Sequence, residues 1–538
     1  MLALLAALAF VGCHPEDPVI VSISPERGVP GEIILIEGAY FGAERGASFV
    51  TIAGTQPTAA AYLDWSDAMI LLRAPDFGDA GLVFVHVEGR RSNGAFFANA
   101  AAIPRTVPGE RSGIGPAIAS ISPPEAAVGS VVTITGSGFG NSRGSGAVFF
   151  TRESFSPTGA RALVQVTDAE FGYELWTDRE IRARVPDGAA SGHLEVRTAR
   201  GSSGPARFDV SAGPGTKTFG DRREHVITYS VTINTRDASE PNALHLWVPS
   251  PAASAEQRDI QMLSGSPAPS IMDYMGTSFH RLENLEAHSG ANVNISWAVG
   301  VYEVRTEVRP EEIRRVASPI RDANTRACPR VPSDDPVVRG LAASIFGTQA
   351  NPYLRARAIY EWMLRSLEWV PRARSDGVLY AVENLRADPF LGALLFVALL
   401  RAADVPSRPV AGVLVNPDRR ALNHYWAEFW IDGLGWIPAD PAMGASILAG
   451  GSPLPVEFLP QEARGYAEER ADAAAFYFGN IDSQRIAFSR GVTDISPLDP
   501  RGRTITHVRS YALQTLWEEA VGNIDYTSVW GGIIIYGR

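Results

Sequence analysis

Features that would point to several common function classes are missing from this sequence. Lys and Arg number 48 against 59 Asp and Glu, a net charge of −11, so there is no excess positive charge to bind nucleic-acid phosphates. There is no His-Glu-x-x-His, no Cys-x-x-Cys and no glycine-rich phosphate loop with its lysine. Metal ions and nucleotide cofactors are therefore not predicted. After residue 13 no apolar stretch approaches the roughly 18 residues of a membrane-spanning helix.

Cysteine is scarce too, with only Cys13 and Cys328 among 538 residues. Residues 1–13 are an apolar run that ends Phe10-Val11-Gly12-Cys13. This run resembles a bacterial lipoprotein signal peptide, which implies that Cys13 becomes the acylated mature N-terminus. Phe10 in place of leucine, and the lack of Lys or Arg before the run, depart from that pattern. A buried N-terminal helix is the alternative.

The lipoprotein interpretation implies where the protein resides. It predicts a cell-envelope protein anchored to a membrane through Cys13. His14 is not an acidic retention signal, which favours the outer membrane if the cell has one. After processing, Cys328 has no cysteine left to pair with, so stability must come from hydrophobic cores. A chain of this length predicts several such cores.

Two stretches, residues 18–98 and 116–210, are copies of one unit. Ile23-Ser24-Pro25 recurs 98 residues later as Ile121-Ser122-Pro123, and Trp65-Ser66-Asp67 recurs 111 residues later as Trp176-Thr177-Asp178. The change of offset means that the second copy carries 13 extra residues, between Gly146 and Trp176. A linker rich in Pro, Gly and Arg separates the copies.

Both copies show the pattern of short β-strands. Val83, Val85 and Val87 alternate with other residues, and Gly or Pro interrupts the pattern at short intervals. In each copy the order Ile-Ser-Pro, then Gly, then Gly-x-x-Phe-Gly resembles the immunoglobulin-like IPT/TIG domain. The resemblance implies two all-β immunoglobulin-like sandwiches that act as spacers or interaction modules. A dedicated ligand site in them is the alternative.

Residues 218–310 predict a further β domain. From Val226 to Ile233 the side chains alternate, and Ala243–Pro249 and Asn292–Val308 supply further strands. The Leu246-Trp247-Val248-Pro249 strand is similar to the segment that precedes bacterial transglutaminase-like domains. That similarity implies a buttress for the domain that follows.

From residue 331 onwards helices are followed by strands. Asn351-Pro352 is an N-cap with a proline at the first helical position, and it starts a helix with one apolar face. The stretch from Pro389 to Ala403 is apolar nearly all round, which predicts a buried helix. Strands are expected at residues 410–414, 424–432 and 435–440. These elements predict an α+β domain over residues 331–500, and residues 501–538 form a C-terminal extension with a last strand.

Two motifs carry a specific resemblance. The first is the run Ala393–Arg408, and the second is His424-x-Trp426-x-Glu428 followed by Gly435-Trp436-x-Pro438-x-Asp440-Pro441. Both closely resemble the transglutaminase-like superfamily, which has the papain-type fold. Residues 478–488 are similar to a segment found after that core in bacterial members. In active members a cysteine begins the buried helix, a histidine takes its proton, and an acid orients the histidine.

This chain matches two of the three catalytic positions of that family. His424 fits the base and Asp440 fits the orienting acid, but an alignment without gaps places Pro389 at the nucleophile. Proline has no nucleophilic group, although it suits the first turn of a helix capped by Asp388. Cys328 precedes Pro389 by 61 residues and is interpreted as an inert thiol; a role as nucleophile is the alternative.

The loop between the strands expected at residues 424–432 and 435–440 decides whether His424 and Asp440 can meet. A two-residue loop would place the two side chains on opposite faces of the hairpin. A three-residue loop, from Asp432 to Leu434, would pair Trp426 with Asp440. His424 and Asp440 would then be diagonal neighbours on one face, about 7–8 Å apart at Cα. We predict the three-residue loop, and we interpret Trp426 and Trp436 as core or as walls of a cleft.

The sequence thus predicts a multidomain lipoprotein of the cell envelope whose transglutaminase-like domain has lost thiol catalysis. In this hypothesis the old cleft binds peptides, proteins or cell-wall material, without a cofactor. One alternative is an active thiol-dependent peptidase, amidase or crosslinking enzyme that uses Cys328 or another group. A second is that His424 and Asp440 are only a hydrogen-bonded core feature. A third is that the two sandwiches carry the function by binding a surface partner.

Overall fold

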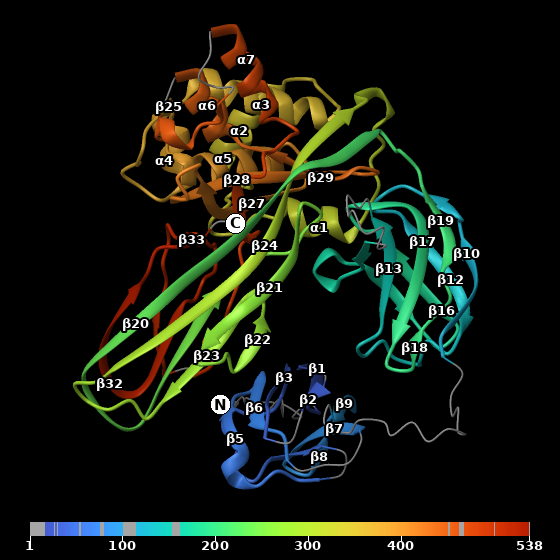
Figure 1. Cartoon of the computed structure of the whole chain (residues 1–538), viewed down its shortest axis with the longest axis vertical. Helices are drawn as coiled ribbons and strands as arrows, with labels where there is room; N and C mark the ends of the chain where they lie inside the picture. Colours follow the sequence, from blue (N-terminus) through green and yellow to red (C-terminus); the bar gives the residue numbers. More distant parts are fainter. Residues whose placement is uncertain are drawn as a thin grey trace, which may run out of the picture. The chain divides into compact units, whose positions relative to one another are not determined.

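The computed structural model describes residues 17–25, 27–28, 31–52, 55–75, 80–99, 115–152, 162–449, 452–461, 467–499 and 501–536. The chain divides into two compact units, one of residues 1–109 with 498–500 and one of residues 110–497 with 501–538 (Figure 1). The predicted signal peptide and Cys13 lie outside the described residues. Within the described ranges, no helix is both long and apolar enough to cross a membrane.

The first repeat folds into two β-sheets that share one core. One sheet has the order β1-β3-β6-β5 and the other β2-β9-β7-β4, with β8 beside β7. Alternating side chains such as Ile34, Ile36, Val83 and Val85 are fully buried between them, as strands with one buried face require. The strands are β1 (Val19–Ser24), β2 (Arg27–Gly28), β3 (Ile33–Ala39), β4 (Phe49–Ile52), β5 (Tyr62–Trp65), β6 (Met69–Arg73), β7 (Ala80–Val87), β8 (Arg90–Arg91) and β9 (Ala95–Asn99).

The second repeat has the same two-sheet arrangement, with the orders β10-β12-β16-β15 and β11-β19-β17-β13-β14. The equivalent Trp65 and Trp176 donate from Nε1 to the carbonyl oxygens of Phe41 (2.9 Å) and Phe139 (3.1 Å). The repeated residues therefore make the same contact in both copies. The strands are β10 (Ala117–Ser122), β11 (Glu125–Ala126), β12 (Val131–Ser137), β13 (Ala147–Arg152), β14 (Leu163–Gln165), β15 (Tyr173–Trp176), β16 (Glu180–Arg184), β17 (Ala189–Thr198), β18 (Gly201–Ser202) and β19 (Ala206–Val210).

A third β domain follows, which we call the buttress domain and define as β20–β24 with β31–β33. Its main strand, β20, pairs with β24 from Gly215 to Asn234 and with β32 from Val231 to Leu246 (Figure 1). The C-terminal residues, predicted as an extension with one last strand, contribute three strands to this sheet. The strands are β20 (Gly215–Pro249), β21 (Gln257–Ser266), β22 (Ile271–Tyr274), β23 (Thr277–Glu283), β24 (Gly290–Val308), β31 (Arg503–Ile505), β32 (Glu518–Trp530) and β33 (Ile534–Tyr536).

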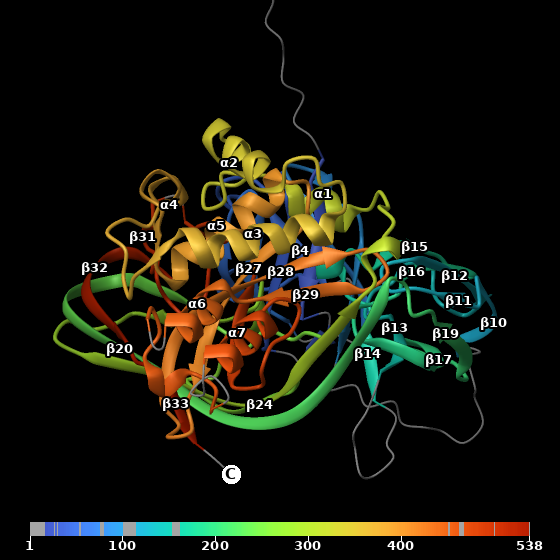
Figure 2. The same ribbon diagram turned by 90° about the horizontal axis from the view of Figure 1, so that it is seen from above.

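Residues between the buttress strands form an α+β domain, as predicted. Its sheet has the order β29-β28-β27-β30, and α5 packs on β27 and β28 (Figure 2). Asn351 and Asp388 cap α3 and α5 through their side chains, and a proline follows each of them. The elements are α1 (Pro319–Thr325), α2 (Pro336–Phe346), α3 (Pro352–Ser366), β25 (Glu368–Trp369), α4 (Val378–Asn384), β26 (Arg386–Ala387), α5 (Pro389–Ala402), β27 (Ser407–Val415), β28 (Ala421–Ile431), β29 (Gly435–Ala439), α6 (Pro441–Ala449), α7 (Ala467–Phe476) and β30 (Arg485–Arg490).

The second sandwich is joined to both neighbouring domains. Trp430 and Trp436 of the β28–β29 hairpin are part of the sandwich's hydrophobic core cluster. Lys217 of β20 donates from Nζ to both carboxylate oxygens of Asp187 (2.7 and 2.9 Å) and to the carbonyl oxygen of Trp436 (2.6 Å). A Cβ atom on Gly213 would lie 2.5 Å from the Gly433 carbonyl oxygen, so this junction requires glycine.

Candidate functional site

His424 and Asp440 meet as the hairpin geometry predicted. Ile431 pairs with Gly435, so the loop has three residues, and continuing the register pairs Trp426 with Asp440. His424 Nε2 lies 2.7 Å from Asp440 Oδ2, and both side chains are completely buried. The prediction of a three-residue loop is therefore confirmed, and strands β28 and β29 place the imidazole and the carboxylate on the same face of the sheet.

Asp440 has two further hydrogen-bond partners besides His424. Its Oδ2 also accepts a hydrogen bond from Arg485 Nη1 (2.9 Å), and its Oδ1 accepts one from the main-chain N–H of Met443 in α6 (2.9 Å). Burial acts to raise the pKa of Asp440, but His424 and Arg485 outweigh it and lower the pKa to about 2. The carboxylate is therefore charged at neutral pH and ties together β28, β29, β30 and α6.

Arg485 itself is anchored by a second carboxylate. Its Nη2 lies 2.6 Å from Asp482 Oδ2, and Tyr477 donates its hydroxyl to the same carboxylate at 2.8 Å. Burial favours loss of the Arg485 charge, but Asp482 and Asp440 together raise the pKa of Arg485 above its ordinary value. The sequence did not lead us to single out Arg485, although an arginine directly before the apolar run Ile486-Ala487-Phe488 was a usable signal.

The histidine has one ring nitrogen left over. His424 Nδ1 is buried and has no hydrogen-bond partner among the described residues. The ring stacks near Trp426, with centroids 6.1 Å apart and planes at 20°. Trp426 is in turn packed against Phe219 and Tyr302 of the buttress domain. The imidazole is therefore enclosed, and the linings of four pockets in the described part of the chain include neither His424 nor Asp440.

The side chain that meets the first turn of α5 is Tyr425, not His424. Tyr425 belongs to the core cluster built around α5, and its ring makes an edge contact with Phe390 at 5.1 Å between centroids. Successive residues of a strand point to opposite faces, and β28 pairs with β27 without a register shift. His424 therefore leaves the sheet on the face opposite to the side chains that pack on α5.

Pro389, the residue at the nucleophile position, is buried at the first turn of α5. Asp388 caps the helix by accepting from the N–H of Leu391 (2.9 Å), and its other oxygen accepts from the N–H of Ala373 (2.8 Å). Arg509 forms an ion pair with Asp388, and its guanidinium lies 4.8 Å from the centre of the Phe390 ring. The unpaired N–H groups that would activate a thiol at this helix end are thus capped and covered.

Arg509 belongs to a segment that lies across this helix end. We call residues 507–516 the strap. Tyr425 donates its hydroxyl to the carbonyl oxygen of Ser510 (2.7 Å), Arg509 Nη2 donates to the carbonyl oxygen of Ser375 (2.8 Å), and Leu513 is buried in the α5 core cluster. The prediction of a cleft at these residues is therefore wrong. The strap covers the face of β28 that carries Tyr425, and the Arg485 network covers the face that carries His424.

Cys328 lies beside the other end of α5. Cys328 packs against the α5 core cluster, and Arg401 Nη1 donates to the carbonyl oxygen of the nearby Arg326 (2.6 Å). A helix rises about 1.5 Å per residue, so Arg401 lies about 18 Å along the axis from Pro389. Cys328 is thus at the wrong end of α5 to replace a nucleophile at its first turn.

The two tryptophans interpreted as cleft walls do not line a cleft. Trp426 is 2% exposed and lies between the sheet and the buttress domain. Trp436 is 5% exposed, packs in the second sandwich and donates from Nε1 to Glu170 (3.0 Å). Both side chains hold domains together, because the outer faces of β28 and β29 are covered by those domains. No group of His, Cys, Asp and Glu residues in the described ranges is arranged to hold a metal ion.

Comparison with protein families identifies the domains. The transglutaminase-like superfamily matches residues 339–441, and the IPT/TIG domain matches residues 18–100 and 116–212. The chain therefore contains a transglutaminase-like domain and two IPT/TIG domains, as the motifs predicted.

Individual relatives are distant. An uncharacterized protein of Haemophilus influenzae is 24% identical over 196 residues, which cover 30% of this chain and 48% of the relative. The chain thus matches about half the length of that relative. Among solved structures, a candidate cysteine protease from Cytophaga hutchinsonii is 15% identical, with a TM-score of 0.38 over 60% of this chain and 94% of that one. SGBP-B from a xyloglucan utilization locus of Bacteroides uniformis is 10% identical, with a TM-score of 0.22 over 54% and 99%.

Proposed function

We propose that this chain is a lipid-anchored protein of the cell envelope whose transglutaminase-like domain no longer catalyses a thiol reaction and serves in binding peptides, proteins or cell-wall material. The observation that carries the loss of catalysis is Pro389 at the first turn of α5. A proline offers neither a thiol nor a hydroxyl to attack an amide.

Three further features support the loss of catalysis. The first turn of α5 is capped by Asp388 and covered by the strap. His424 leaves β28 on the face opposite to Tyr425, the residue that contacts this turn. The remaining thiol, Cys328, lies beside Arg401 at the far end of the helix. A general base must lie within hydrogen-bond reach of the group it deprotonates, and no cysteine meets that condition among the described residues.

In this proposal His424 and Asp440 serve to stabilise the fold. Asp440 joins two strands, an arginine and a helix N-terminus at one buried point. Removing one partner from a buried charge network destabilises a protein strongly, by about 3–5 kcal/mol. Folding alone therefore gives a reason to keep His424 and Asp440 after the nucleophile has been replaced.

The loss of catalysis is tested with the full chain and a fluorogenic panel of peptide, amide and glutamine substrates. We expect no turnover by the wild type, by Cys328→Ala or by His424→Ala. Turnover by the wild type that Cys328→Ala or His424→Ala abolishes would establish the rival hypothesis of a thiol-dependent enzyme.

The variant Pro389→Cys tests the geometry of the site. We expect its new thiol to react with iodoacetamide at the same rate with and without His424→Ala, because the imidazole faces away from α5. The thiol of Cys328 in the wild type is the matched control. A reaction that is fast in Pro389→Cys and slowed by His424→Ala would mean that His424 can still act as a base there.

The anchor is tested separately. Cells that express the full gene with Cys13 are expected to incorporate labelled palmitate into the protein and to retain it in the membrane fraction. Cys13→Ser should abolish both, since the acyl chains are attached through this residue. Membrane retention that survives Cys13→Ser would contradict the lipoprotein proposal.

A further inference from the structure

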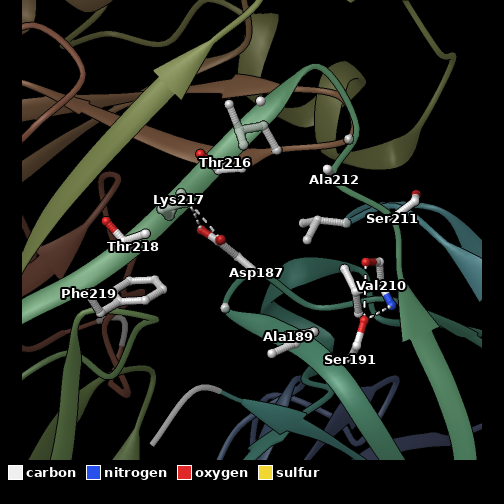
Figure 3. A pocket seen from close by; sticks show the side chains of 16 residues that line it. Asp187, Ala189, Ser191, Val210, Ser211, Ala212, Thr216, Lys217, Thr218 and Phe219 are labelled. Atoms are coloured by element: carbon white, nitrogen blue, oxygen red, sulfur yellow. Dashed lines mark hydrogen bonds and ion pairs between the residues drawn. The ribbon is translucent and has the colours of Figure 1, made fainter. Parts of the chain in front are cut away.

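A groove of about 500 Å³ lies where the second sandwich, the buttress domain and the transglutaminase-like domain meet (Figure 3). The first residues of β20, Gly215–Phe219, form one side. Residues 188–191 and 210–212 of the second sandwich form the opposite side, and Gly433 and Leu434 at the tip of the β28–β29 hairpin close one end. The groove shares no residue with the Pro389, His424 and Asp440 positions.

The edge of β20 that borders the groove has no strand beside it. β33 pairs with β20 only from Val226 to Thr228, and β32 pairs with it only from Val231 onwards. On its other edge, residues Gly215–Gly220 pair with Glu303–Val308 of β24. Within the described sheet, the first residues of β20 are therefore an edge strand on the groove side.

The hydrogen bonds of β24 identify which groups of β20 face the groove. Thr306 pairs with Lys217, yet its N–H donates to Asn480 Oδ1 (2.8 Å). Val304 pairs with Phe219, yet it exchanges hydrogen bonds with Ile481 (2.8 and 3.0 Å).

These are the non-hydrogen-bonded pairs of an antiparallel ladder, in which main-chain groups point away from the partner strand. The N–H and C=O groups of Lys217 and Phe219 therefore point towards the groove. None of these four groups has a hydrogen-bond partner among the described residues.

The lining of the groove as a whole carries no net charge, and its side opposite to β20 is formed largely by small residues. Gly188, Ala189, Ala190 and Ala212 lie there. The only charged residues of the lining are Asp187 and Lys217, and they neutralise each other at 2.7 and 2.9 Å (Figure 3). A charged ligand side chain would find no free counter-ion in this lining.

We propose that the groove binds an extended, uncharged peptide segment of a partner protein, which adds as a strand to the free edge of β20 at Lys217 and Phe219. Four main-chain hydrogen bonds would hold the segment, and the small residues of the second sandwich would accept its outward side chains. This inference rests on the proposed binding function and deepens it by naming the class of partner. It places the binding site away from the old catalytic motif.

The unliganded edge is tested first by hydrogen exchange at single-residue resolution in the full chain. The amides of Lys217 and Phe219 should exchange quickly, whereas those of Thr216 and Thr218, which face β24, should be protected. Equal protection of the two sets of amides would show that this edge of β20 is not free, and it would overturn the proposal.

Binding is then tested with a phage-displayed library of random dodecapeptides selected on the immobilised full chain. Ala212→Trp and Ala190→Trp fill the groove, and Ala343→Trp on the exposed surface of α2 is the matched control. We expect enriched peptides that bind the wild type and Ala343→Trp but bind both groove variants at least about tenfold more weakly. Enrichment that does not depend on the groove would overturn the proposal.

The mode of binding is tested on the enriched peptides themselves. N-methylation at the alternate residues that face β20 should weaken binding about tenfold, and N-methylation at the intervening residues should leave it unchanged. The same affinity for both sets would overturn strand addition. Turnover in the substrate panel would instead contradict the loss of catalysis and leave these results intact, so the two failures are distinguishable.

Discussion

Two buried histidine–carboxylate pairs in this molecule have nearly the same distance between the ring nitrogen and the carboxylate oxygen. In the transglutaminase-like domain His424 Nε2 lies 2.7 Å from Asp440 Oδ2, and in the buttress domain His245 Nδ1 lies 2.8 Å from Glu519 Oε2. In both pairs the second ring nitrogen is buried and has no partner among the described residues. An imidazole held by a carboxylate is therefore not in itself a sign of catalysis.

The surroundings of the two pairs differ. Asp440 also binds Arg485 and caps α6 through Met443, so it joins four elements. His245 lies among aromatic rings, with the centroids of Phe279 and Trp247 at 5.6 and 6.2 Å. The comparison teaches that the contacts around such a pair decide its role, because Asp440 also holds an arginine and the start of a helix. Substitutions that act on this difference test it directly.

The largest expected effect is that of Asp440→Asn. The substitution leaves the buried Arg485 with Asp482 as its only carboxylate and weakens the cap of α6. We expect the free energy of unfolding to fall by about 3–5 kcal/mol, as for a broken buried ion pair. Urea denaturation followed by tryptophan fluorescence measures the change.

Glu519→Gln is the matched control in the other pair. The amide keeps the shape of the carboxylate and can still accept a hydrogen bond from His245. We expect a smaller loss, about 1–3 kcal/mol, as for a weakened buried hydrogen bond. Equal losses in the two variants would mean that the charge network does not distinguish the pairs.

The second effect is a dependence of stability on pH. The pKa of Asp440 is about 2 in the folded protein, below its ordinary value of 3.8. Its contribution, about 2 kcal/mol, is complete above pH 4 and is lost as the pH falls towards 2, because the unfolded chain takes up the proton first. The urea midpoint of the wild type should therefore fall more steeply over this range than that of Asp440→Asn. Parallel curves would contradict the low pKa.

The hairpin shows how much of the site local sequence could predict. The turn residues Asp432-Gly433-Leu434 and the period of two fixed the register, so the meeting of His424 and Asp440 followed from neighbouring residues. The capped helix that starts at Pro389 followed in the same way. Such features depend on spacing over a few residues, and spacing is visible in a sequence.

The remaining features depend on contacts between distant parts of the chain. His245 and Glu519 are 274 residues apart, and Arg485 reaches Asp440 across 45 residues. Strand propensity in β28 also could not reveal that its two faces are covered by a strap and a second domain. The expectation of an open cleft failed for that reason, since covering segments leave no periodic signal in the strand they cover.

The smallest effect concerns the strap, which covers the α5 side of β28 and continues into β32, the strand that carries Glu519. Tyr425 is held by burial and by its hydrogen bond to the Ser510 carbonyl oxygen at 2.7 Å. Tyr425→Phe removes only the hydroxyl, so we expect a loss of about 1 kcal/mol and faster amide exchange within residues 507–516. His424 and Asp440 lie on the opposite face, so the pH dependence assigned to Asp440 should stay as in the wild type. A change in that pH dependence would mean that the two faces of β28 are coupled, and the separation of His424 from the first turn of α5 would then fail.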